Sequence, residues 1–383
     1  MCQARGATKL CFEAAVWLFF VNIFSMRKRL VLGLILAAAV LGAAGFIVYR
    51  IYQAKSAPEQ LASPPKLENL TENTLAAASL WLFAVDDGSP QLAVSAGQDQ
   101  EVVLGRFDQD NPTQSIDWKV AISKADSGGR GVADHWHIFA HDLHWIVSST
   151  PGDQESYLAT FDKNFNRTNF VAIENTANVP TNDMFLVAEK DGVAVGHFLP
   201  GTGHKIFRFD KNAKLKGTVD VGGGQYAHTN GSSAEMTETG FIIFATETLA
   251  PDIEGGVKKI VTDLDWKPLN AVSLLREEGQ NIVMATSVLL ENGYRVVNAR
   301  VRDNAKTFDP TGPPAPPEPG QPLLDDAGAI VRYIISPDDK IVSQETLDAQ
   351  GANRPHTLLA GDLLITTWDS KSGVKLRIDK VSF

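Results

Sequence analysis

Histidine and arginine side chains recur in three short polar segments, each of which precedes an apolar run. These segments are Arg130 to His137 (RGVADHWH), Gly222 to Asn230 (GGGQYAHTN) and Asn353 to His356 (NRPH). The side chains in them that are suited to contact a ligand are Arg130, His135, His137, Tyr226, His228, Asn230, Arg354 and His356. Four of these are also candidate catalytic groups, namely His137, His228, Arg354 and His356.

Three kinds of chemistry fit this set. Imidazoles that converge on one point bind a transition metal. Imidazoles beside guanidinium groups act as a general acid or base on an anionic substrate, with Arg130 and Arg354 as clamps. The third alternative is a polar rim that binds a ligand without catalysis. No residue set assigns a metal site, and the sequence requires no cofactor. The only cysteines, Cys2 and Cys11, precede the body of the chain, so that body has no thiol nucleophile.

A recurring strand pattern must position these groups. A short strand that ends in an Asp turn spans Tyr157–Asn164 and returns 48 residues later at Lys205–Asn212. Asp and Asn favour such turns because their side chains hydrogen-bond to nearby backbone amides. A second unit, two strands joined by a tight turn, precedes each copy, as at His141–Val147 and Lys190–Val195. Each repeat therefore predicts four short antiparallel strands within about 45–55 residues.

This pattern resembles the six-bladed β-propeller superfamily. The predicted fold is all-β, with six four-stranded antiparallel blades near residues 81–121, 135–175, 183–221, 234–276, 281–346 and 354–383. The last blade lacks one strand, which we expect residues 67–78 to supply, since this closes the ring. The Pro-rich stretch 309–322 is expected to be a loop within the domain 67–383. A large antiparallel sandwich is the alternative architecture.

On the propeller interpretation, the histidine segments enter alternate blades and surround one central channel. The stretch His228–Ser232, followed by Phe241–Thr246, resembles a His-x-Asn blade entry of periplasmic arylsulfotransferases. That resemblance implies a six-bladed enzyme that uses channel histidines, but the rest of the family's pattern has no counterpart that we can place. The Asp162 and Asp210 turns lack the ligand number of calcium loops and are expected to be structural.

The N-terminal region predicts a membrane anchor. Arg27–Arg29 precede an uncharged stretch, Leu30–Tyr49, whose length fits a bilayer core, so residues 26–50 are expected to form a signal anchor. A cleaved secretory signal is the alternative. Residues 1–25 are expected to be a misassigned start or a cytoplasmic extension, and residues 51–66 a stalk. The predicted topology is a single-pass membrane protein with a cytoplasmic N-terminus and a periplasmic or extracellular body.

The charge distribution restricts the partners of that body. Residues 56–383 carry a net charge of −16, which would repel a nucleic acid backbone. The expected partners are therefore the membrane, through the N-terminal helix, and a protein or small molecule at the propeller face. The sequence favours a binding or scaffolding module whose ligand is unknown. The alternative is an extracytoplasmic enzyme, arylsulfotransferase-like or metal-dependent, that uses histidines at the mouth of the channel.

Overall fold

The computed structural model describes most of one compact unit, Ala62–Phe383. The described residues are 63–75, 80–108, 111, 115–150, 155–173, 184–199, 203–222, 232–247, 256–276, 280–303, 328–370 and 373–383. The predicted anchor 26–50, the extension 1–25, most of the stalk and the insertion 309–322 lie outside these ranges. Along the described ranges, no helix has the length and apolar character needed to cross a membrane.

The described chain is all-β, and its strands form antiparallel sheets. Four sheets have four strands each, in the orders β2-β3-β4-β5, β6-β7-β8-β9, β10-β11-β12-β13 and β14-β15-β16-β17, and a fifth has seven, in the order β1-β23-β22-β21-β20-β19-β18. The strand bounds are β1 Lys66–Leu75, β2 Leu80–Val85, β3 Leu92–Gln98, β4 Glu101–Phe107, β5 Lys119–Ile122, β6 Asp134–Ala140, β7 Leu143–Ser149, β8 Ser156–Phe161, β9 Arg167–Ile173, β10 Met184–Glu189, β11 Gly192–Leu199, β12 Gly203–Asp210, β13 Leu215–Val221, β14 Ser232–Met236, β15 Gly240–Glu247, β16 Gly256–Asp263, β17 Pro268–Leu275, β18 Gln280–Leu289, β19 Arg295–Asp303, β20 Gly328–Ile335, β21 Ile341–Ala360, β22 Leu363–Ser370 and β23 Gly373–Ser382.

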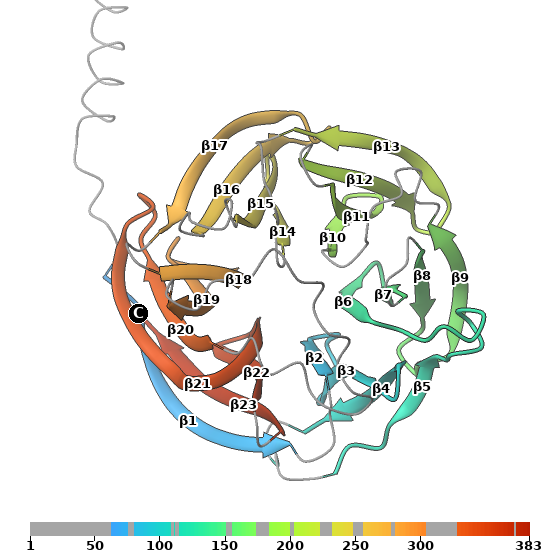
Figure 1. Cartoon of the computed structure of the whole chain (residues 1–383), viewed down its shortest axis with the longest axis horizontal. Helices are drawn as coiled ribbons and strands as arrows, with labels where there is room; N and C mark the ends of the chain where they lie inside the picture. Colours follow the sequence, from blue (N-terminus) through green and yellow to red (C-terminus); the bar gives the residue numbers. More distant parts are fainter. Residues whose placement is uncertain are drawn as a thin grey trace, which may run out of the picture. The chain divides into compact units, whose positions relative to one another are not determined.

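The sheets follow one another around a ring, with β2, β6, β10, β14 and β18 on the inside and β1 at the outer edge (Figure 1). Neighbouring sheets touch through these inner strands: β2 contacts β6, β6 contacts β10, and β10 contacts β14. The seven-stranded sheet completes the ring, since β18 contacts β14 and β21 contacts β2. The repeated four-stranded sheets and their ring arrangement are those of a β-propeller, so the sandwich alternative is wrong.

The ring is closed by strands from the two ends of the domain. β1 pairs with β23 from Lys66 opposite Ser382 to Leu75 opposite Val374. The predicted closure by residues 67–78 is therefore confirmed over the described part of that segment. The 20-residue strand β21 links the two halves of the seven-stranded sheet, because Ile341–Ala352 pairs with β20 and Asn353–Ala360 pairs with β22.

Strand alternation places the apolar core between successive sheets. In β7, Trp145 and Val147 face the third sheet and pack with Leu186 and Phe207, whereas Ile146 faces the first sheet. Both faces of the middle strand β8 are therefore buried, since all six of its residues are buried. Two ends of the ring follow from this arrangement. We call the end at which the inner strands begin the entry end, and the opposite end the turn end.

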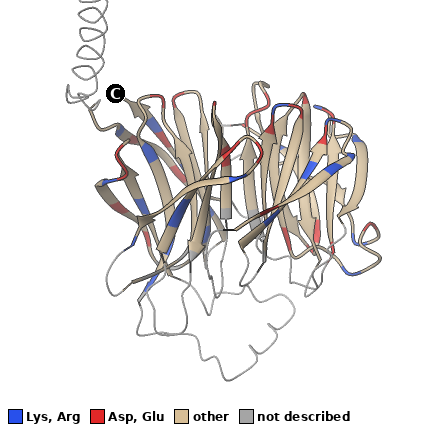
Figure 2. Ribbon diagram, turned by 90° about the horizontal axis from the view of Figure 1, so that it is seen from above, with Lys and Arg blue, Asp and Glu red and all other residues tan. Residues whose placement is uncertain are grey.

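Hairpin turns at the turn end repeat one geometry. The Asp210 carboxylate accepts hydrogen bonds from the amides of Asn212 and Lys214, both at 2.9 Å, and Asp162 and Asp263 do the same in their own turns. The fourth residue of each turn has a positive φ, as at Ala213 (57°). The prediction that these Asp segments form turns is thus confirmed. Acidic residues accordingly recur in the hairpins at the end where the C-terminus lies (Figure 2).

Substitution of a turn aspartate should weaken the fold modestly. We expect Asp210→Ala to lower the free energy of unfolding by about 1 kcal/mol, because two backbone amides lose their acceptor and can regain only water. The neighbouring substitution Lys211→Ala removes an exposed side chain and serves as the matched control. Chemical denaturation of both variants measures the difference, and equal midpoints would contradict the structural role of the Asp210 carboxylate.

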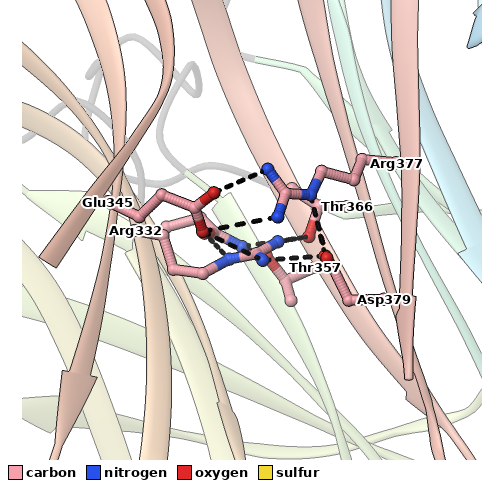
Figure 3. A network of polar contacts seen from close by, with 7 residues as sticks. Arg332, Glu345, Thr357, Thr366, Arg377 and Asp379 are labelled. Carbon is pink, nitrogen blue, oxygen red and sulfur yellow. Dashed lines mark hydrogen bonds and ion pairs between the residues drawn. The ribbon is translucent and has the colours of Figure 1, made fainter. Parts of the chain in front are cut away.

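The halves of the seven-stranded sheet are joined by a buried polar network (Figure 3). The Arg332 guanidinium of β20 donates to Asp379 Oδ2 of β23 at 2.7 Å and to Thr366 Oγ1 of β22 at 2.9 Å. Arg377 donates to the other oxygen of Asp379 at 2.9 Å and also to Glu345. Arg332 and Asp379 are 1% and 0% exposed, so their charges are compensated inside the protein rather than by water.

Candidate functional site: a pocket at the entry end

A pocket opens where four inner strands begin. Its cavity volume is about 10 Å³, which is room for about one water molecule. Its lining residues come from β2, β6, β18 and β21 and are Leu82, Phe83, Trp136, Met284, Thr286, Arg354, Pro355 and His356. The lining is mostly apolar and aromatic, with three polar side chains among it, which is the usual composition of a small-molecule site.

Phe83 is the centre of an aromatic cluster in this pocket. The His356 ring lies 4.3 Å from the Phe83 ring, centroid to centroid, and the Trp136 ring lies 5.1 Å from it. On the other side, the His135 ring packs edge-on against Phe83 at 5.0 Å. Trp136 and His356 also meet at right angles at 6.0 Å. Phe83 therefore connects the pocket with the interior of the interface between the first two sheets.

The polar groups of the pocket are a guanidinium and a neutral imidazole. Arg354 Nη1 lies 3.9 Å from Asp369 Oδ2, and Asp134 also adds favourable electrostatics to that guanidinium. Burial lowers the pKa of His356 to about 3, so this ring is uncharged at neutral pH. An open channel mouth would leave this imidazole near the ordinary pKa of about 6.5, whereas the pocket desolvates it.

A file of polar side chains runs through the interface of the first two sheets. His135 shares a hydrogen bond of 3.0 Å with Ser95, and His137 Nε2 lies 3.1 Å from His144 Nδ1. His144 Nε2 in turn lies 3.1 Å from Asp87 Oδ2. We call His135, His137, His144 and Asp87 the histidine seam.

The seam imidazoles are all neutral at neutral pH. Burial, and next the nearby His356, lower the pKa of His135 to about 3. Burial lowers the pKa of His144 to about 4, although the Asp87 carboxylate opposes this shift. Burial and the adjacent His144 hold the pKa of His137 well below its usual value. Burial would raise the pKa of Asp87, but hydrogen bonds from Arg106 and Ser89 keep it below its usual value.

Charge at Asp87 also fixes the imidazole tautomers. Arg106 Nη2 lies 2.7 Å from Asp87 Oδ2, which keeps this buried carboxylate ionised. A ring lone pair 3.1 Å from a carboxylate would be repelled, so His144 Nε2 carries the ring proton. His144 Nδ1 is then unprotonated and accepts a hydrogen bond from His137 Nε2–H. His137 Nδ1 is then an unprotonated acceptor, and this buried atom has no hydrogen-bond partner among the described residues.

The structure separates the candidate residues predicted from the sequence. Arg354 and His356 line the pocket, and His135 lies behind it against Phe83. His137 is 2% exposed and contacts His144 rather than the channel mouth. Arg130 pairs with Glu155, and both side chains are substantially exposed. The remaining candidates, Tyr226, His228 and Asn230, lie outside the described residues.

Sequence reasoning missed the apolar half of the site. Phe83, Trp136 and Met284 are strand residues that resemble any other core position, and only their place near the start of inner strands marks them. Across the described ranges, no group of three His, Cys, Asp or Glu side chains is arranged to hold a metal ion. The predicted convergence of imidazoles includes His228, which lies outside the described residues, so it stays a prediction.

Comparisons with known proteins support the fold alone. No protein-family model matches the chain, and no curated protein matches it either. A member of the DUF4221 family from Bacteroides vulgatus is similar in structure, with a TM-score of 0.51, 9% identity, and coverage of 83% of this chain and 98% of that one. AofleA from Arthrobotrys oligospora is also similar, with a TM-score of 0.50, 10% identity, and coverage of 84% and 88%. At such low identity the likeness extends to the β-propeller architecture only.

Proposed function

We propose that this chain is a six-bladed propeller that acts as a binding module and takes a small ligand in the pocket at the entry end. The blade count rests on β21, whose first half is the outer strand of one blade and whose second half is the inner strand of the next. Counted this way, the seven-stranded sheet is two four-stranded blades, β18 to β21 and β21 to β1.

The observation that carries the binding proposal is the convergence of eight side chains from four strands on one opening. Phe83 and Trp136 offer aromatic faces, while Arg354, Thr286 and His356 offer hydrogen bonds. The lining favours a ligand with one ring and one polar substituent, because apolar contact supplies affinity and the few polar groups fix its orientation. Such a ligand enters only when the lining side chains move apart, since the cavity volume is about 10 Å³.

The described chain enters the propeller at the turn end. Ser63, the first described residue, accepts a hydrogen bond through its carbonyl from Asn292, in the turn between β18 and β19. The proposed membrane anchor, residues 26–50, precedes this point in the chain.

The enzyme alternative has a narrower basis. Its arylsulfotransferase-like version rests on His228 and Asn230, and its metal-dependent version has no ligand set among the described side chains. A polar binding site therefore remains the function that the pocket supports best.

A larger side chain in the pocket should weaken ligand binding. We expect phenol to give a saturation-transfer NMR signal with the wild-type protein, and Met284→Trp to reduce its affinity at least tenfold, because the new indole occupies the ligand's space. Leu269→Trp adds the same indole at an exposed position on β17 and is the matched control. Equal phenol binding by both variants would refute the pocket as the binding site.

A further inference from the structure

We propose that the histidine seam is an acid-sensitive latch: it holds the first two sheets together at neutral pH and lets them separate at low pH. This separation takes the pocket apart. This inference concerns regulation of the pocket and, in its ligand-release step, rests on the proposed function. Separation of the sheets is a property of the fold and can be measured without a ligand.

The first argument is the concentration of imidazoles. The structure buries His135, His137 and His144 in this one interface, at 2% exposure or less, and places His356 beside them across Phe83. The third sheet, by comparison, contains only the buried His197 and His204. Protonation of buried neutral histidines destabilises the packing around them, and this destabilisation is therefore greatest where the first two sheets meet.

The second argument concerns the charges that surround the seam. Protonation of His135 or His356 places a cation near the Arg354 guanidinium, which lies on the pocket side and already lowers the pKa of His135. Protonation of His144 places a cation beside the Asp87 carboxylate, which stabilises it, but also near the Arg106 guanidinium, which repels it. The titratable or charged groups that face the seam are Asp87 from the β2–β3 turn, Arg106 from β4, Asp162 from the β8–β9 turn, and Arg354 and His356 from β21, with Asp134 and Asp369 around Arg354.

Asp87 is the carboxylate in contact with the seam, and it cannot neutralise several protonated imidazoles. It already pairs with Arg106, so each proton after the first adds repulsion, most of all between His137 and His144, which are 3.1 Å apart. Opening the interface exposes these rings to water, where they accept protons at their ordinary pKa of about 6.5. Between pH 7 and pH 5, the opening equilibrium should therefore rise about 25-fold for each histidine that becomes solvated.

Separation of the sheets changes the pocket because Phe83 contacts both the histidine seam and the other pocket residues. Its ring touches His135 in the seam and His356 and Trp136 in the pocket. Separation of β2 from β6 removes Phe83 from Trp136, and the aromatic half of the pocket is then lost.

Amide hydrogen exchange of the full chain in a mild detergent tests the latch. After correction for intrinsic rates, we expect exchange in β2, β3, β6 and β7 to accelerate between pH 7 and pH 5 by at least tenfold more than exchange in β11, β12 and β16. A uniform change across all sheets, or none, would overturn the latch.

Two variants identify the responsible groups. His137→Gln keeps a donor toward His144 but cannot be protonated, and should reduce the pH-dependent acceleration in β6 and β7 about 25-fold. His197→Gln is the matched control, since His197 contacts Ser156 in the next interface as His135 contacts Ser95. It should leave exchange in β6 and β7 unchanged. If the His137 variant fails to fold, the wild-type exchange pattern still decides the question.

Release of phenol between pH 7 and pH 5 tests the link to the pocket. Loss of the saturation-transfer signal together with faster exchange in β6 supports it. Retention of phenol in the opened state would overturn the link, whereas absence of phenol binding at pH 7 would count against the proposed function and not against the latch.

Discussion

Lowering the pH from 7 to 6 should reduce the free energy of unfolding by about 4 kcal/mol, and lowering it to 5 should reduce it by about 11 kcal/mol. Six histidines cause this loss, because the folded protein desolvates them as neutral rings. They are His135, His137, His144, His197, His204 and His356. Burial lowers the pKa of both His197 and His204 to about 4, as it does for His144.

The direction follows from the proton count of each state. In the unfolded chain a histidine binds a proton below a pKa of about 6.5. In the folded protein the pKa of His137 lies well below this value, and the pKa values of the other five histidines are about 3 to about 4. Their stabilisation is therefore complete above pH 6.5 and is lost as the pH falls from 6.5 toward 4. Each ring contributes about 2 kcal/mol of this loss by pH 5, and domains of this kind are stable by only about 5–15 kcal/mol.

Urea denaturation at pH 7.5, 6.5 and 5.5 measures the effect. The variant His197→Gln/His204→Gln should lose less stability on acidification, by about one third, because two of the six groups no longer titrate. Identical unfolding midpoints for the wild type across this pH range would show that these rings are not buried as neutral groups.

Asp379→Asn should lower the free energy of unfolding by about 3–5 kcal/mol. The substitution keeps the shape of the side chain but removes the negative charge that Arg332 and Arg377 share. Arg377 keeps Glu345 as a partner, at 2.9 Å. Arg332 is 1% exposed and lies 3.9 Å from Glu345, so neither water nor Glu345 replaces the missing carboxylate at Arg332.

Two further variants separate charge burial from general damage. Replacing both members of the buried pair, as in Arg332→Met/Asp379→Leu, should recover much of the loss because no uncompensated charge remains. Asp362→Asn breaks the exposed pair of Asp362 with Lys380, on the strand that also carries Asp379, and should leave the unfolding midpoint unchanged. A midpoint for Asp379→Asn as high as that of Asp362→Asn would contradict the role of the network.

The sequence alone determined the repeat and its boundaries. The Asp turns at Asp162 and Asp210 identified the same hairpin in successive sheets, since local side-chain-to-backbone hydrogen bonds need only neighbouring residues. The shortage of one strand at the C-terminal end identified β1 as its partner, because an open ring would leave two unpaired edges. The continuous path of β21 was not foreseen, since the pattern of residues 341–360 does not mark where one sheet ends and the next begins.

Only the tertiary structure decided what the candidate side chains do. The histidines at 135 and 137 were correctly identified as noteworthy but placed at an open mouth, whereas neighbouring sheets bury both and suppress their protonation. The link from His137 through His144 to Asp87 joins residues of two sheets, and no spacing in the sequence encodes it. The same holds for Phe83, Met284 and His356, which meet in one pocket because the ring closes. Strand periodicity is a local property, but burial, pKa and the lining of a pocket depend on which sheets pack together.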